Sequence, residues 1–175
     1  MRITRRFLLS GGSLTATLAA VGGWRLLAAG NANAAGAGAG AGAQSFEVTL
    51  SDEAWRQKLT PAQYTVLRHE GTERPFSSPL NDEHRKGVFS CAGCQLDLFS
   101  SSTKFDSGTG WPSFWAPLAN AVGTTEDRTF GMVRTAVHCR RCGGHLGHVF
   151  DDGPKPTGLR YCMNGVAMTF RPVSA

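Results

Sequence analysis

The segment that decides the fold is His138-Cys139-Arg140-Arg141-Cys142-Gly143-Gly144-His145-Leu146-Gly147-His148-Val149-Phe150. It joins a Cys-x-x-Cys pair and a glycine turn to residues 145–150, which are typical of a β-strand. A second pair, Cys91-Ala92-Gly93-Cys94, lies far upstream. A two-residue spacer lets both sulfurs of one turn reach one metal ion, so the pairs predict a tetrahedral zinc site with four thiolates. We expect this site to clamp together two loops of one domain.

The same four cysteines are also compatible with two disulfide bonds. The N-terminus indicates export, and disulfides form in oxidising compartments. We favour zinc, because a disulfide between cysteines separated by only two residues is strained and redox-active, which is unusual in a structural framework.

The rest of the domain predicts a mainly β fold. Short helices are expected from Ser51 to Lys58 and from Thr60 to His69, with Gly71 ending the second. Beyond them, short apolar runs are separated by Gly and Asp turns, which favours an antiparallel β core with helices only at its start. The expected strands cover residues 87–90, 97–100, 129–137, 145–150 and 159–170.

The first 49 residues form a separate region. Arg5-Arg6, a moderately apolar run at 14–27 and Ala32-Asn33-Ala34 are typical of a twin-arginine-type signal peptide over residues 1–34. Residues 35–49, which begin with an Ala-Gly repeat, predict a flexible linker before a domain at 50–173. We therefore expect export to the bacterial periplasm or another extracytoplasmic space. Arg25 argues against a stable membrane anchor, although an uncleaved N-terminal anchor is the alternative.

The net charge of +5 does not indicate nucleic-acid binding. Four of the 18 basic residues lie in the first 34 residues, which contain no acid, so 14 basic side chains face 13 acidic ones in the remainder. The domain has almost no basic excess, and we expect no nucleic-acid partner.

Cys162 is the fifth cysteine and belongs to neither pair. A lone cysteine in an apolar strand is often buried and inert. Here Arg160 and Asn164 stand two residues away on either side, so a strand would place all three side chains on one face. A cation beside the thiol favours the reactive thiolate.

His145 and His148 are three residues apart, which in a regular strand places them on opposite faces. They would face one site if Gly147 interrupts the alternation with a bulge. The alternative is a pair of surface histidines near the metal loop.

Five segments together resemble the peptide methionine sulfoxide reductase B family. They are residues 74–81 (RPFSSPLN), 91–94 (CAGC), 104–114 (KFDSGTGWPSF), 138–150 (HCRRCGGHLGHVF) and 159–164 (LRYCMN). The resemblance runs from about Leu50 to Pro172. It implies two antiparallel β-sheets, a structural zinc site with the four cysteine ligands Cys91, Cys94, Cys139 and Cys142, and reduction of the R epimer of methionine sulfoxide, free or in oxidised proteins.

The resemblance also implies catalytic roles. Cys162 would be the nucleophile, and His145 and His148 would lie near the sulfoxide oxygen, one donating a proton and the other positioning the oxygen or a water. Asn164 would hold the substrate or the histidine network by hydrogen bonds.

Three further residues would form the substrate-binding site. Trp111 would pack against the ε-methyl group and discriminate between the two epimers, although alone it would be interpreted as a core residue. Phe150 would complete the apolar pocket, and Arg160 would favour the thiolate.

Thr109 departs from the family pattern. Many members carry a second cysteine at this position, which resolves the sulfenic acid on the nucleophile. Since no other cysteine is spare, we expect an external thiol reductant, either a thioredoxin-like protein or a small thiol. The alternative class is a non-catalytic zinc-thiolate protein, which would require neither Cys162 nor the histidine pair.

Overall fold

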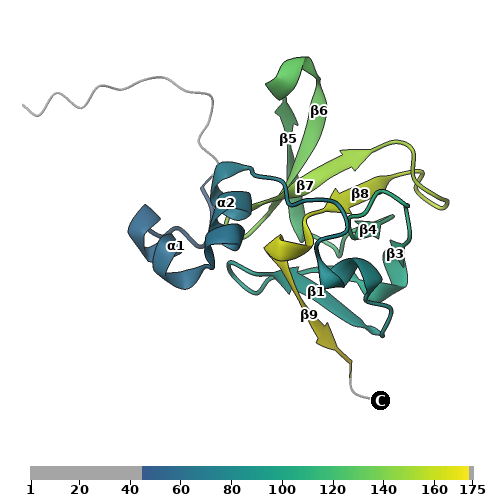
Figure 1. Cartoon of the computed structure of the whole chain (residues 1–175), viewed down its shortest axis with the longest axis horizontal. Helices are drawn as coiled ribbons and strands as arrows, with labels where there is room; N and C mark the ends of the chain where they lie inside the picture. Colours follow the sequence, from purple (N-terminus) through teal and green to yellow (C-terminus); the bar gives the residue numbers. More distant parts are fainter. Residues whose placement is uncertain (1–44, 174–175) are drawn as a thin grey trace, which may run out of the picture. The chain divides into compact units, whose positions relative to one another are not determined.

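The computed structural model describes residues 45–173, and the predictions for the signal segment and for linker residues 35–44 lie outside them. The chain forms two helices, α1 (Asp52–Lys58) and α2 (Pro61–His69), before its strands (Figure 1). Nine strands follow: β1 (Gly87–Cys91), β2 (Asp97–Ser100), β3 (Lys104–Phe105), β4 (Ser113–Phe114), β5 (Val122–Asp127), β6 (Arg134–Cys139), β7 (His145–Phe150), β8 (Arg160–Met163) and β9 (Met168–Pro172). No helix in residues 45–173 is both long and apolar enough to cross a membrane.

Both predicted helices are present. The Ser51 side chain accepts a hydrogen bond from the Ala54 N–H, and Thr60 and Gln63 form a capping box at the start of α2. The end of α2 differs from the prediction, because Glu70 rather than Gly71 adopts the left-handed conformation, with φ of 54°.

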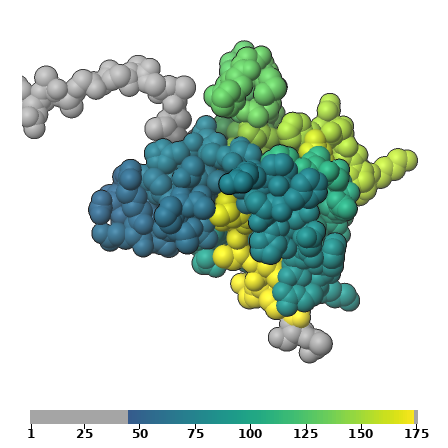
Figure 2. Space-filling model, in the orientation of Figure 1, coloured from purple at the N-terminus to yellow at the C-terminus, as the bar shows by residue number. Residues whose placement is uncertain are grey.

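The strands form two antiparallel sheets, which confirms the predicted fold class. The smaller sheet has the order β2-β1-β9, and the larger has the order β3-β4-β8-β7-β6-β5. In the larger sheet β5 and β6 form a hairpin that projects from the body of the domain (Figures 1 and 2).

Aromatic side chains fill the space between the two sheets. Phe114 of β4 stacks on Phe99 of β2 with ring centroids 4.4 Å apart, and it meets Phe89 of β1 edge-on at 5.0 Å. All three are fully buried. Such offset and edge-to-face pairs are favourable beyond the area they bury, so this cluster is the centre of the core.

Two expected strands are broken by turns. The run predicted at 129–137 starts only at Arg134, because the carboxylate of Asp127 accepts the N–H and hydroxyl of Thr129 and closes a turn there. The run predicted at 159–170 divides into β8 and β9, since a 3₁₀ turn at Gly165–Ala167 carries the chain from the larger sheet to the smaller. A β-carbon at Gly165 would lie 2.0 Å from the Ser78 hydroxyl, so this crossing needs glycine.

Side chains along β7 and β8 point alternately to the two faces of the larger sheet, of which one packs on the core. Val149 and Tyr161 are opposite each other and pack against the core. Their neighbours His148 and Cys162, also opposite each other, therefore point to the other side of the sheet. This second face carries the candidate active site.

Candidate functional site

Four cysteines gather at the junction of the two sheets, as the spacing of the Cys-x-x-Cys pairs predicts. Their sulfurs all lie within 4.8 Å of one another, with 3.7 Å between Cys91 and Cys142 and 3.4 Å between Cys94 and Cys139. A tetrahedron with zinc–sulfur bonds of about 2.3 Å has sulfur–sulfur edges of about 3.8 Å. The cluster is thus placed to hold one metal ion, and none of the five cysteines, all described, forms a disulfide.

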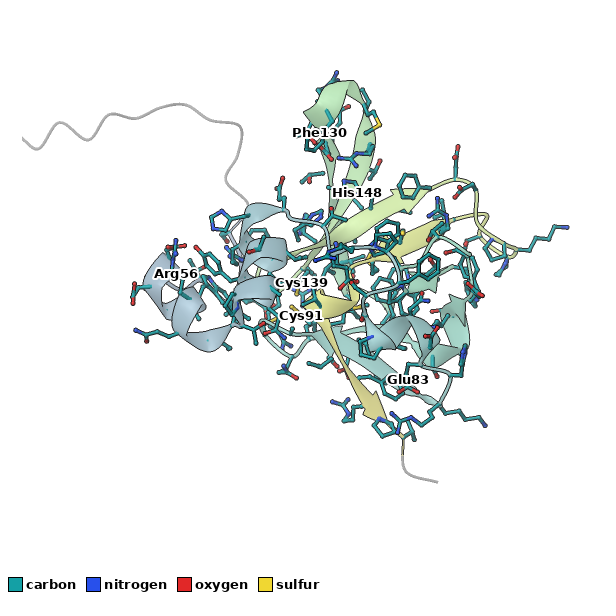
Figure 3. The ribbon with its side chains drawn as sticks, in the orientation of Figure 1. Arg56, Glu83, Cys91, Phe130, Cys139 and His148 are labelled. Carbon is teal, nitrogen blue, oxygen red and sulfur yellow. The ribbon has the colours of Figure 1, made fainter. Side chains whose placement is uncertain are left out.

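Each pair sits on a turn that follows a strand, and the two strands belong to different sheets. Cys91 ends β1 of the smaller sheet and Cys139 ends β6 of the larger sheet (Figure 3). A metal bound here would therefore cross-link the two sheets. Glycine supplies the left-handed residue of only one turn, at Gly143; in the other turn Gln95, not Gly93, adopts it with φ of 60°.

Cys162 lies apart from this cluster, in the middle of the larger sheet. It is half-buried, with His148 of β7 opposite it on one side and Ser113 of β4 on the other. Its sulfur lies 3.8 Å from the hydroxyl of Thr109. The remaining thiol of the sequence is thus only partly buried and is held by three neighbouring segments.

A β-bulge brings His145 and His148 together. Val137 is opposite Gly147 and His138 is opposite His145, so Leu146 is an extra residue without a partner on β6. The bulge resets the alternation, and the two imidazoles meet edge-on with ring centroids 5.3 Å apart. The conditional prediction of a shared face for these histidines is confirmed.

The two imidazoles have different surroundings. Burial, with a smaller contribution from the neighbouring His148, lowers the pKa of His145 to about 4. Its Nε2 has no partner among the described residues. His148 instead bonds through Nε2 to the Asp127 carboxylate at 2.8 Å.

Asp127 is a site residue that the sequence did not reveal. It ends β5, opposite Arg134 and beside the loop that joins β5 to β6. Besides His148, its carboxylate accepts hydrogen bonds from Thr129 and from Arg134 at 2.6 Å, and these contacts lower the pKa of Asp127 well below its usual range. The Asp-x-Thr spacing indicates a turn, but no local signal predicts the contact with a histidine 21 residues later.

Arg160 and Phe150 share the face of Cys162. They are opposite each other on β8 and β7, with the guanidinium 4.4 Å from the ring centroid. Asp152 binds the same guanidinium through two contacts of 2.8 Å, which raises the pKa of Arg160 and lowers that of Asp152. Arg160 is therefore a fixed cation beside the thiol.

Trp111 and Asn164 are both held by the backbone of Glu73. The indole Nε1 donates to the Glu73 carbonyl at 3.1 Å, and the Asn164 Oδ1 accepts the Glu73 N–H at 2.9 Å. The Asn164 amide also donates to the Leu146 carbonyl at 3.0 Å. Asn164 lies beyond the end of β8 and is buried, so the expectation that it continues the strand face of Cys162 is wrong. Its bonds join the Glu73 loop to the bulge that positions the histidines.

Comparison with known proteins finds relatives that match most of the described domain. The family model named SelR domain matches residues 59–172. The chain is similar to the "Peptide methionine sulfoxide reductase MsrB" of Agrobacterium fabrum, with 56% identity over 128 residues that cover 73% of this chain and 95% of the relative. Proteins of the same name from Pseudomonas putida (strain W619) and Leptospira interrogans are 55% and 51% identical, over 74% and 73% of this chain and 96% and 98% of their own lengths.

Proposed function

The chain belongs to the SelR-domain family of peptide methionine sulfoxide reductases, and we propose that it reduces the R epimer of methionine sulfoxide with Cys162 as nucleophile. It is an enzyme that reduces methionine sulfoxide, as its family does. The observation that carries the proposed mechanism is the shared face on which the thiol lies beside His148 and Arg160. We expect both free methionine sulfoxide and oxidised proteins to be substrates.

The proposed reaction transfers one oxygen atom from the substrate to Cys162 and two electrons from Cys162 to the substrate. The Cys162 sulfur attacks the sulfoxide sulfur, the S–O bond breaks, and the products are methionine and a sulfenic acid on Cys162. The sulfoxide is reduced and the thiol is oxidised. Two external thiols then restore Cys162, forming one disulfide and one water.

His148 is the proposed proton donor to the sulfoxide oxygen. Its contact with the Asp127 carboxylate fixes the orientation of the ring. His145, whose pKa burial lowers to about 4, is neutral at pH 7 and serves to position the oxygen or a water by hydrogen bonding.

Trp111 and Phe150 form the proposed wall for the substrate methyl group. The indole is anchored through Nε1, so its flat face is held in one orientation. A fixed aromatic surface can accept the methyl group of one sulfoxide epimer while excluding the other by steric contact.

The test compares the separated R and S epimers of N-acetylmethionine sulfoxide, with dithiothreitol as reductant and methionine formation as the readout. We expect activity on the R epimer, its loss in Cys162→Ser with metal content unchanged, and a decrease of about 10²–10⁴-fold in His148→Ala. His84→Ala, at an exposed histidine outside the site, is the matched control. Equal rates on both epimers, or full activity in Cys162→Ser, would refute the proposal.

An external thiol is the proposed reductant because all other cysteines belong to the metal cluster. After a single turnover, Cys162 should be trapped as a sulfenic acid by dimedone, with no intramolecular disulfide. Conversely, T109C should form a disulfide with Cys162, since the side-chain ends at these positions are 3.8 Å apart. A disulfide between Cys162 and a cluster cysteine in the wild type would contradict this assignment.

We propose zinc as the ion of the cysteine cluster. It would be held by Cys91, Cys94, Cys139 and Cys142, and four protein thiolates leave no open position, so its contribution is to stability alone. Metal analysis of the purified protein is the direct test, and a metal-free, fully active protein would exclude it.

We propose export by the twin-arginine route, which lets the domain fold and bind metal in the cytoplasm. Arg5-Arg6→Lys-Lys should leave full-length protein in the cytoplasmic fraction. Normal export of this double variant would point to another route.

A further inference from the structure

Three hydroxyl groups form a chain that ends at the nucleophile. Ser113 Oγ lies 3.1 Å from the Trp111 carbonyl oxygen and 2.7 Å from Ser107 Oγ. Ser107 Oγ is 2.8 Å from Thr109 Oγ1, which in turn lies 3.8 Å from the Cys162 sulfur. Neither the metal cluster nor the histidine pair belongs to this chain.

Each hydroxyl carries one hydrogen, so the donor and the acceptor of each hydrogen bond in the chain can be assigned. When Cys162 is a thiol, the S–H donates to Thr109, Thr109 to Ser107, Ser107 to Ser113, and Ser113 to the Trp111 carbonyl. Every donor then has an acceptor.

When Cys162 is a thiolate, the same groups can form these hydrogen bonds in the opposite direction. Thr109 donates to the sulfur, Ser107 donates to Thr109, and Ser113 donates to Ser107. Ser107 also accepts the Thr109 backbone N–H at 3.4 Å, which holds it in place in both states. The chain reverses by rotation of three hydroxyls, while the thiol proton itself leaves to solvent.

We propose that Thr109 stabilises the thiolate of Cys162, and that the Ser113-Ser107-Thr109 hydroxyl chain reverses direction when the thiol ionises. Hydrogen bonds to an anion are shorter and stronger than those between neutral groups, and neighbouring hydroxyls in series polarise one another. Thr109 is therefore more than a position that lacks a resolving cysteine.

Other charged groups also act on this sulfur and must stay constant in the test. Arg160 lies on the same strand, with Asp152 bound to it, and His148 is opposite Cys162, with Asp127 bound to it. Thr109→Val keeps all four and replaces only the hydroxyl by a methyl group of similar size. The inference rests on the proposed role of Cys162, but its test does not require turnover.

The experiment measures the rate of iodoacetamide alkylation at Cys162 across pH in the metal-loaded protein, located by peptide mass mapping. In T109V the midpoint of this profile should rise by about one pH unit, which is about tenfold less thiolate at a pH below both midpoints. T109S should restore the wild-type midpoint, and S107A should shift it in the same direction by less. Metal content and melting temperature must match the wild type in each variant.

Two outcomes overturn the inference: an unmoved midpoint in T109V, or equal shifts in T109V and T109S. The failure of the proposed function would be seen separately, as full sulfoxide reduction by Cys162→Ser. The alkylation profile and the activity of that variant are independent measurements, so the two failures are distinguishable.

Discussion

Protonation of His145 should weaken the folded state in mild acid. The side chain is 5% exposed, and burial lowers its pKa to about 4. In the unfolded chain the same imidazole has its ordinary pKa of about 6.5. Below that pH the unfolded state takes up a proton that the folded state does not, so stability is fully present above about 6.5 and is lost as the pH falls toward 4.

The size of this loss follows from the two pKa values. Between pH 7 and pH 5, linkage at His145 alone removes about 2 kcal/mol from the free energy of unfolding. This is a large fraction of the ~5–15 kcal/mol that stabilises a typical domain. The main cause is desolvation of the imidazolium in the buried site. The neighbouring His148 also disfavours a positive charge there, and the Nε2 of His145 has no partner among the residues described.

Urea unfolding at pH 7 and pH 5 measures the effect, with metal content checked at each pH. His145→Gln removes the titrating group, so its stability should fall by about 2 kcal/mol less than that of the wild type over this interval. His84→Gln, at an exposed position, should behave like the wild type. If His145→Gln loses as much stability as the wild type, the imidazole is already charged in the fold and the reasoning is refuted.

Three further substitutions test the metal cluster, the orienting carboxylate and the bulge. Cys94→Ser should release the metal and lower the free energy of unfolding by several kcal/mol, measured by metal analysis and thermal melting; an unchanged metal content would exclude this ligand. Asp127→Asn should reduce kcat about tenfold or more with little change in KM, because it removes the charge that orients His148; unchanged kinetics would remove Asp127 from the site. Gly147→Ala would place a methyl carbon 2.1 Å from the Cys162 carbonyl oxygen. It should therefore lower the free energy of unfolding by about 1–3 kcal/mol and displace β8, which carries the nucleophile. Wild-type stability and activity would show that β7 and β8 can move apart without cost.

Local signals in the sequence were sufficient for much of the fold. The N-caps of both helices follow from Ser51 and Thr60, since a cap needs only residues three apart in the chain. The strand at 145–150 and the gathering of the four cysteines were also predicted correctly, because strand alternation and thiolate spacing are local patterns. Strand ends were less accurate where a side chain such as Asp127 closes a turn, and β3, β4 and β5 were not predicted.

By itself, the sequence determined which chemical groups are available: two Cys-x-x-Cys pairs, a fifth cysteine, the pair His145 and His148, and Thr109 between two glycines. Only the tertiary structure decided how they meet. The contacts of His148 with Asp127, of Trp111 and Asn164 with Glu73, and of Thr109 with Cys162 join residues far apart in the chain. The positions of Asp127, His148 and Cys162 depend on strand register and on one bulge, and a shift of a single residue would turn these side chains to the opposite face of the sheet.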